Sequence, residues 1–257
     1  MNKLTQDILE KLYYQFFPTI LGRKNRYPIR HYIETFGYVL KTGISWRDLK
    51  TPLHWSSYYK KFKIWADSGL FKILHKTMLA VAKQKNKLTN DHLKTLYIDS
   101  TLIKNVKGVD LLGKNHYDRN RKGNKLTLII SSNGLPVSIS LTTANRHDLL
   151  EVIPAIENIQ VKIISSRLVA DRGYVSKSLQ KNLKSKKIRL IYPYKKNQRV
   201  KNTKLEKSLN KRYLVENTFA TLQNYRKLRL RYEKLFTTFV QFYYFGLSEL
   251  LAQKISN

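Results

Sequence analysis

The spacing of apolar residues changes once along this chain, and that change restricts the fold more than any other feature. Up to about residue 85, apolar side chains recur three and four positions apart, the period of a helix. The first such series is Ile8, Leu9, Leu12, Tyr13, Phe16 and Phe17. From Lys94 onward, short apolar runs alternate with turns and helical stretches. We therefore expect an all-helical domain over residues 1–88 and a mixed α/β domain over residues 89–257.

The expected N-terminal domain has the features of a helix-turn-helix. Helices are predicted over residues 29–41 and 56–67, with a short helical turn at 46–49 between them. The helix over 56–67 carries Lys60, Lys61 and Lys63 together with two tyrosines. Short helices joined by tight turns, one of them basic and aromatic, are typical of DNA readers. We expect these three lysines to contact DNA, and the alternative is a helical cap with a solvated basic face.

The second part alternates strands and helices in a recognisable order. Strands are predicted over residues 96–103, 125–132, 135–141, 167–171 and 188–192, and helices after Asp148, over 175–183 and over 212–228. Asn133-Gly134, between the second and third strands, is a strong hairpin signal. The order β-β-β-α-β-α-β-α is that of an RNase H-like fold, a five-stranded mixed sheet with flanking helices.

The charge balance indicates a polyanionic partner. The 257 residues include 49 Lys and Arg but only 17 Asp and Glu, which gives a net charge of +32. An AT-rich genome would favour lysine codons, but it would not explain the scarcity of acidic residues. Nucleic acid is therefore the expected partner.

Several classes of protein are disfavoured. The chain has no cysteine, so a disulfide framework and a cysteine zinc site are excluded. The N-terminus lacks the apolar segment of a signal peptide. The most apolar stretch, residues 235–251, contains Thr237, Gln241 and Glu249, which favours a buried helix over a membrane span. We expect a soluble cytoplasmic protein.

Three acidic residues stand where carboxylates are costly. Asp99 follows the apolar run 96–98, Asp171 follows 168–170, and Glu216 lies in an amphipathic helix. A carboxylate that ends a buried strand loses hydration unless a positive charge meets it. The two strands are neighbours in an RNase H-like sheet, so the carboxylates can converge.

Clustered carboxylates need cations, and hard oxygen ligands select Mg²⁺ or Mn²⁺. Two such ions can support an in-line phosphoryl transfer. We expect Asp99 to bridge both ions, Asp171 to bind one and Glu216 the other. Each residue alone has a simpler interpretation: a strand-terminal Asp as a turn former or helix cap, and Glu216 as the ion-pair partner of Arg212 one turn earlier. Their shared topological order favours the metal site.

Basic residues flank this site. One cluster precedes the hairpin (Lys114, Arg119, Arg121, Lys122 and Lys125) and another covers residues 195–211. Phosphate contact is expected for both, and a solvated charge run is the alternative. We interpret His147-Asp148 as a loop and helix cap, and Trp46 and Trp65 as core residues.

Four segments together resemble a known family. YIDST (97–101), VADRGY (169–174) and RYLVENTFATLQNYRKLRLRYEK (212–234) resemble the three catalytic blocks of DDE insertion-sequence transposases of the insertion sequence five (four/five-like) group. GISWRDL (43–49) resembles the helical domain of the same group. The resemblance extends over residues 10–245.

This resemblance implies a reaction. Asp99, Asp171 and Glu216 fall on the family's catalytic triad, which implies two Mg²⁺ (or Mn²⁺) ions, nicking at terminal inverted repeats and joining of the 3′-OH ends to target DNA. The implied partners are double-stranded DNA, as element ends and target, and further copies of the chain. A dimer is expected because two ends must be paired. The implied location is the bacterial cytoplasm or nucleoid.

The family's Tyr-Arg-Glu-Lys signature is matched in part. Arg212 and Glu216 match, whereas Leu and Gln occupy the Tyr and Lys positions. We expect Arg212, Arg226 and Lys227 to contact DNA, the last two in place of the missing lysine. Two other functions stay open: a metal-dependent nuclease that cuts without joining, and a non-catalytic DNA-binding protein from a domesticated or decayed copy.

Overall fold

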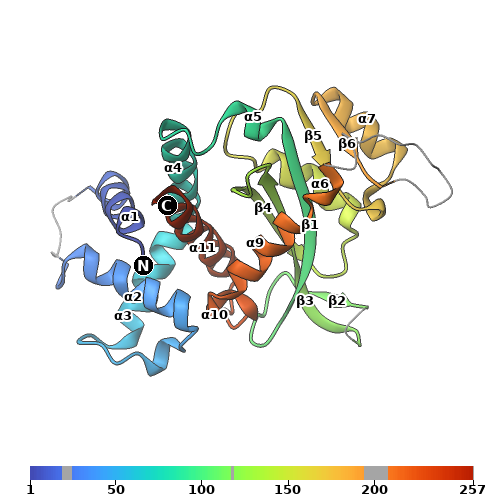
Figure 1. The fold of residues 1–257 in the computed structure, drawn as a ribbon. Coiled ribbons are helices and arrows are strands. Elements are labelled where there is room, and N and C mark those ends of the chain that lie inside the picture. Colours follow the sequence, from blue (N-terminus) through green and yellow to red (C-terminus); the bar gives the residue numbers. More distant parts are fainter. Residues whose placement is uncertain (19–24, 117–118, 194–207, 257) are drawn as a thin grey trace. The chain divides into compact units, whose positions relative to one another are not determined.

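The computed structural model describes residues 1–18, 25–116, 119–193 and 208–256 (Figure 1). The chain divides into two compact units. The first unit comprises Met1–Ala82, Lys104–Leu111 and Thr221–Asn257, and the second comprises Lys83–Ile103 and Leu112–Ala220. This division differs from the boundary expected at residues 88 and 89, because the C-terminal segment groups with the N-terminal helices.

The first unit is helical, as its apolar spacing predicts. Its elements are α1 (Lys3–Phe16), α2 (Ile29–Thr42), η1 (Trp46–Asp48), α3 (Trp55–Asp67), α4 (Leu70–Gln84), α10 (Arg226–Arg229) and α11 (Phe236–Ser256). Helix α2 ends at Gly43, which has a φ of 68° and donates its N–H to Val39 at 2.9 Å. Glycine adopts this left-handed conformation without the penalty a side chain would bring.

Aromatic side chains form the core of the first unit. Phe62 of α3 stacks on Phe242 of α11, with 4.1 Å between the ring centroids. Trp46 and Trp65 are buried in the same core, which confirms their interpretation as structural. None of the described helices is both long enough and apolar enough to cross a membrane.

The second unit is a six-stranded mixed sheet with helices. The strands are β1 (Thr95–Lys104), β2 (Gly113–Asn115), β3 (Arg121–Ser131), β4 (Pro136–Thr143), β5 (Ser166–Val169) and β6 (Ile188–Ile191). The helices are α5 (Asn90–Leu93), α6 (Asp148–Glu157), η2 (Arg172–Tyr174), α7 (Lys177–Ser185) and α9 (Tyr213–Gln223). The strand order is β2-β3-β1-β5-β6, with β4 also paired to β3.

This topology confirms the predicted RNase H-like fold. Strands β3 and β4 form the antiparallel hairpin expected around Asn133-Gly134, and β5 pairs in parallel with both β1 and β6. Two details differ from the sequence prediction. Strand β2 was not expected, because its three residues show no apolar alternation. The helix predicted over 212–228 is interrupted at Tyr225, whose ψ of 100° is not helical.

The two faces of the sheet have different roles. Helix α6 packs on β3 and β4, and Ser138 of β4 donates its hydroxyl to the carbonyl of Ala155 in α6 at 2.6 Å. Ser100 of β1 bonds to Thr127 of β3 at 2.8 Å, and Thr127 lies opposite Ser140, which also reaches α6. Because successive strand residues point to opposite faces, Asp99 lies on the face away from α6.

Candidate active site

Asp99, in the middle of β1, lies level with Asp171, which follows the end of the neighbouring parallel strand β5. Strands β1 and β5 pair Tyr97 with Val169, so two residues further on Asp99 is level with Asp171. Strand β5 ends at Val169, and Asp171 accepts a hydrogen bond from the N–H of Arg172 at 2.6 Å as the cap of η2. The chain therefore turns away after β5, while β1 continues past Asp99 to Lys104, and the two carboxylates lie next to each other where β5 ends.

Arg212 lies between the two carboxylates. Its guanidinium is 3.8 Å from Asp99 Oδ2 and 3.6 Å from Asp171 Oδ1. Its Nε is buried without a hydrogen-bond partner among the described residues. A single cation shared by two carboxylates lowers the cost of bringing them together. Arg212 also fixes the start of α9, which carries Glu216 in its first turn.

The pKa of Asp99 shows how the charges are balanced. Burial of the side chain is the largest effect and raises this pKa. The N–H of Ser100, which donates to Asp99 Oδ1 at 2.8 Å, and Arg212 both lower it. Asp171 and Glu216 raise it by repulsion. Both of the other predicted carboxylates therefore act electrostatically on Asp99.

The donor set suits a hard divalent cation. Three carboxylates supply only oxygen ligands, the kind that Mg²⁺ and Mn²⁺ prefer, and Arg212 shows that a positive charge is stabilised between two of them. Across the described part of the chain, no three acidic or histidine side chains are yet gathered at metal-ligand spacing. Glu216 is exposed, so its carboxylate is accessible from solvent.

A hydrogen-bonded chain supports the site from the α6 face of the sheet. Tyr174 donates its hydroxyl to Ser100 Oγ at 2.9 Å, and Ser100 in turn bonds to Thr127. Burial raises the pKa of Tyr174, which keeps this phenol protonated as a donor. Ser100 and Tyr174 each lie within three residues of a candidate carboxylate, so these hydrogen bonds link β1 to η2 next to the carboxylates. This role is not visible in the sequence, although Ser100 directly follows Asp99 and Tyr174 closes the VADRGY block.

The structure places two of the predicted DNA contacts in ion pairs. Lys125 is buried, pairs with Asp148 Oδ1 at 2.5 Å and donates to the carbonyl of Arg146. Lys227 is 4% exposed and pairs with Glu233 Oε1 at 2.6 Å. Both ammonium groups are held by acidic partners inside their own unit. Both side chains are therefore less accessible to a phosphate than an exposed lysine would be.

The remaining predicted basic residues differ in how exposed they are and in whether they have partners within the protein. Lys60, Arg119, Arg121 and Arg226 are exposed. Lys61 lies over the ring of Tyr32, with its Nζ 4.5 Å from the ring centroid, and burial lowers its pKa. Lys63 forms an ion pair with Asp67. In the cluster over 195–211, residues 195–207 lie outside the described part of the chain.

The loop before α6 is structural, as predicted. His147 caps α6, and its Nδ1 accepts the N–H of Leu149 at 3.3 Å. Asp148 is the partner of Lys125. This pair therefore anchors the loop after β4 rather than supplying a general base.

Comparison with known families identifies the chain. The family model described as Transposase DDE domain matches residues 92–245, more than half of the sequence. The chain belongs to the DDE transposase family. A second model, described as Putative transposase of IS4/5 family, matches residues 7–75. Both findings confirm the family resemblance predicted from the catalytic blocks and the N-terminal segment.

A curated relative of this chain is the putative transposase for insertion sequence element IS402 from Burkholderia cepacia. The two proteins are 32% identical over 131 residues, which is 48% of this chain and 59% of the relative. The matched region thus spans about six tenths of that protein's length.

Similar solved structures are also transposases. One is the piggyBac transposase synaptic complex with hairpin DNA, with a TM-score of 0.45 and 10% identity over 99% of this chain and 72% of that one. Another is the catalytic domain of Mos1 mariner transposase, with a TM-score of 0.34 and 9% identity over 71% of this chain and 88% of that one. The assignment of the fold rests on the strand order of the second unit.

Proposed function

We propose that this protein is a transposase that binds the terminal inverted repeats of its insertion sequence, nicks the DNA there and joins the freed 3′-OH ends to target DNA. One observation carries the proposal. Asp99 within β1 and Asp171 just beyond the parallel strand β5 share the guanidinium of Arg212, and Glu216 follows on α9. In a chain with only 17 acidic residues, such a concentration of negative charge suits a cation-dependent reaction at phosphate.

We assign the three carboxylates as ligands of two Mg²⁺ or Mn²⁺ ions. When bound, the ions polarise the phosphoryl oxygen and favour deprotonation of the attacking hydroxyl. Asp99 is the central ligand, because it interacts electrostatically with both Asp171 and Glu216 and its Oδ1 is oriented by Ser100. With metal ions held by Asp99 and Asp171, the Arg212 guanidinium would offer paired N–H donors to a phosphate.

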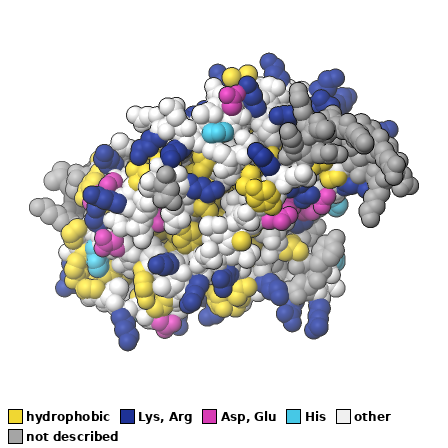
Figure 2. Space-filling view, in the orientation of Figure 1, with side chains coloured by type: hydrophobic (Ala, Val, Ile, Leu, Met, Phe, Trp, Pro, Cys, Tyr) yellow, Lys and Arg dark blue, Asp and Glu magenta, His cyan; other side chains and the backbone are white. Residues whose placement is uncertain are grey.

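DNA binding would rest on basic residues of both units, some exposed and some half-buried. The candidates that remain are Lys60, Lys61, Lys63, Arg119, Arg121, Arg212 and Arg226. Lys and Arg side chains are spread over the face seen in Figure 2, and acidic side chains form only small groups there. We propose a homodimer on DNA, because joining requires two element ends, and a location with the DNA in the bacterial cytoplasm or nucleoid.

The proposal is tested with the purified full chain and a plasmid that carries the gene's own flanking DNA. Gel analysis separates nicked, linear and joined products in the presence and absence of Mg²⁺. We expect both nicking and joining, and a loss of at least about 100-fold in Asp99→Asn, Asp171→Asn and Glu216→Gln, since each removes a metal ligand.

Glu157→Gln is the matched control. Glu157 is an exposed carboxylate of the same unit, paired with Lys186 at 3.1 Å, and its loss should leave both products unchanged. Nicking without joined products would identify a nuclease instead, and DNA binding without nicking would identify a non-catalytic DNA-binding protein.

A further inference from the structure

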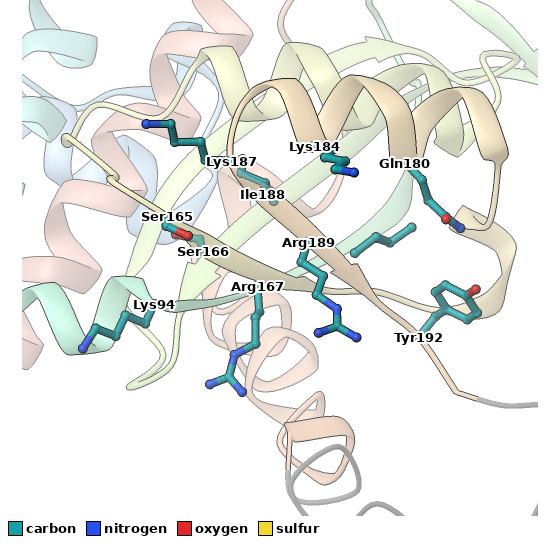
Figure 3. A pocket seen from close by; sticks show the side chains of 11 residues that line it. Lys94, Ser165, Ser166, Arg167, Gln180, Lys184, Lys187, Ile188, Arg189 and Tyr192 are labelled. Carbon is teal, nitrogen blue, oxygen red and sulfur yellow. The ribbon is translucent and has the colours of Figure 1, made fainter. Parts of the chain in front are cut away.

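A basic pocket lies at the far end of the sheet from the carboxylates. It has a volume of about 900 Å³ and runs along β6, the start of β5 and one side of α7 (Figure 3). Five basic side chains line it: Lys94, Arg167, Lys184, Lys187 and Arg189. All five are exposed. No acidic side chain is among the described residues that line the pocket.

The two arginines occupy one row of the sheet. Arg167 of β5 and Arg189 of β6 are register partners, and both point to the same side in Figure 3. Thr95 of β1 lies in the same row, and its hydroxyl accepts a hydrogen bond from Arg167 Nη2 at 2.9 Å. That bond holds the Arg167 guanidinium in place next to the strand.

The row of arginines shares a face with the candidate active site. Asp99 follows Thr95 by four residues, and Asp171 follows Arg167 by four. Since an even spacing keeps side chains on one face of a strand, these rows lie on the same side of the sheet. Four residues of strand span roughly 13 Å. The residues between the two rows, Tyr97 and Val169, are buried, so the arginines and the carboxylates occupy separate places on that side of the sheet.

The stability of the folded state does not explain why five basic side chains gather at this pocket. The carbonyl end of α7 attracts Lys184 and Lys187, but that attraction does not extend to arginines on strands. Like charges on paired strand positions are destabilising. Lys187 also has a φ of 58°, a conformation that glycine adopts at lower cost. The sequence thus places cations here although like-charge repulsion and the left-handed conformation of Lys187 both destabilise the folded state.

We propose that this pocket binds the sugar–phosphate backbone of DNA beyond the reacting phosphate, because its two arginines lie on the same side of the sheet as the carboxylates, roughly 13 Å from them along the strands. The uncharged lining residues fit the same ligand, because Ser165, Gln180 and Tyr192 are the kinds of side chain that contact phosphate and sugar oxygens. This inference rests on the proposed function, and it adds a contact surface that the sequence motifs do not include.

The test is the salt dependence of DNA affinity. Fluorescence anisotropy with a labelled 30-base-pair duplex gives the dissociation constant of the full chain over a series of NaCl concentrations. Arg167→Gln/Arg189→Gln should reduce the magnitude of the slope of log affinity against log salt by roughly 1.8, because each lost phosphate contact contributes roughly 0.9. Arg167→Lys/Arg189→Lys keeps the charges and should retain most of the slope.

The matched control is Lys162→Gln/Lys181→Gln. These exposed residues of the same unit do not line the pocket, and their loss lowers the net charge by the same amount. The control should keep the wild-type slope. Equal slopes in the two glutamine pairs would overturn the proposal.

Another result would also overturn it. Strand β6 is an edge strand, and charges on an edge strand can prevent pairing between molecules. If the arginine variant self-associates in gel filtration while its slope is unchanged, the arginines protect the edge and do not bind DNA.

The proposed function is checked separately on the same preparations by nicking and joining. A wild-type protein that shows the slope difference but neither reaction would support the pocket and overturn the transposase reaction. A wild-type protein without salt-dependent affinity for DNA would overturn both.

Discussion

At the scale of single residues, Arg212 explains how the carboxylates of Asp99 and Asp171 can lie close together on one face of the sheet. It lies within 3.8 Å of Asp99 and 3.6 Å of Asp171, so it supplies the positive charge that the reaction would take from metal ions. The two cations compete for the same carboxylates. Changing Arg212 should therefore alter the response of the protein to Mg²⁺.

We predict that Arg212→Gln melts a few degrees lower than wild type without divalent ions and gains more from Mg²⁺. The loss is about 1 kcal/mol, the scale of a partly exposed charge pair, or roughly 2–4 °C in a chain of this size. Differential scanning fluorimetry with and without Mg²⁺ measures both effects. Arg172→Gln, at a nearby exposed arginine, is the control, and an equal Mg²⁺ gain in both variants would rule out the competition.

Glu249 of α11 gives a pH-dependent prediction. Burial raises the pKa of this carboxyl, and hydrogen bonds such as that from the N–H of Asn2 at 3.0 Å offset only part of the effect. The folded state then binds more protons than the unfolded state between the unfolded pKa, about 4.3, and the folded pKa. Stability therefore falls as pH rises through that interval.

Glu249→Gln removes the cost of ionising this buried carboxyl, because glutamine stays neutral and its side-chain oxygen can still accept the hydrogen bond from the N–H of Asn2. We expect its melting temperature to exceed that of wild type at pH 7 by roughly 2–4 °C. The difference should vanish below about pH 4, where the wild-type carboxyl is protonated. A difference that is constant from pH 4 to pH 7 would show that charge burial is not its cause.

Single residues also show what the sequence could and could not predict. The positions of Asp99 within the first strand and of Asp171 at the end of a later strand were predicted from the sequence, because a carboxylate after an apolar run is visible locally. The ion pairs of Lys125 and Lys227 were not predicted, because each depends on an acidic partner that only the fold brings close. The Tyr174–Ser100–Thr127 chain was missed for the same reason.

At the scale of elements, a buried ion pair fastens α10 to the segment before α11. Lys227 and Glu233 are both 4% exposed, and Trp46 of η1 donates its indole N–H to Glu233 Oε1 at 3.2 Å. The Lys227 ammonium also lies 5.3 Å from the centroid of the Phe242 ring. Losing one member of such a pair leaves the other charge buried and unpaired.

We predict that Lys227→Met destabilises the protein by roughly 3–5 kcal/mol in urea unfolding. The double variant Lys227→Met/Glu233→Gln should recover part of this loss, because no charge then stays buried. DNA affinity at a temperature where both variants are folded should match wild type. A clear loss of affinity in the folded double variant would restore Lys227 as a DNA contact.

Elements were predicted well where their apolar period is strong. The hairpin, the parallel strands and the first-unit helices follow from spacing alone. Strand β2 was not predictable, because three residues become a strand only through pairing with β3. The break between α9 and α10 was hidden because the sequence over 212–228 contains neither Gly nor Pro.

At the scale of the whole molecule, the two units are not simple halves of the sequence. Helix α11 completes the core of the first unit, since Phe242 stacks on Phe62 and Phe245 lies 5.1 Å from Phe71 between ring centroids. Local patterns show that α11 is apolar but not which helices it joins. The order of elements was therefore predictable, and the grouping of the C-terminal helix was not.

We predict that a chain truncated after residue 235 does not keep a folded first unit, because it exposes the aromatic core that α11 covers. Circular dichroism should show loss of helix beyond the deleted segment, and binding of a hydrophobic dye should increase. A full-length chain with Leu150→Ser, at an exposed residue, is the control and should behave as wild type. Cooperative unfolding of the truncated chain at the wild-type temperature would contradict the grouping.

The central claim is that Asp99, Asp171 and Glu216 form one catalytic site for DNA transposition. The most direct measurement is transposition in cells of a marked element built from the gene's own flanking DNA. Wild type is compared with Asp99→Ala, Asp171→Ala, Glu216→Ala and the Glu157→Gln control at matched protein levels. The site described here predicts insertions with wild type and the control and none with the three alanine variants. Insertions that persist after the loss of any one of these carboxylates would contradict it.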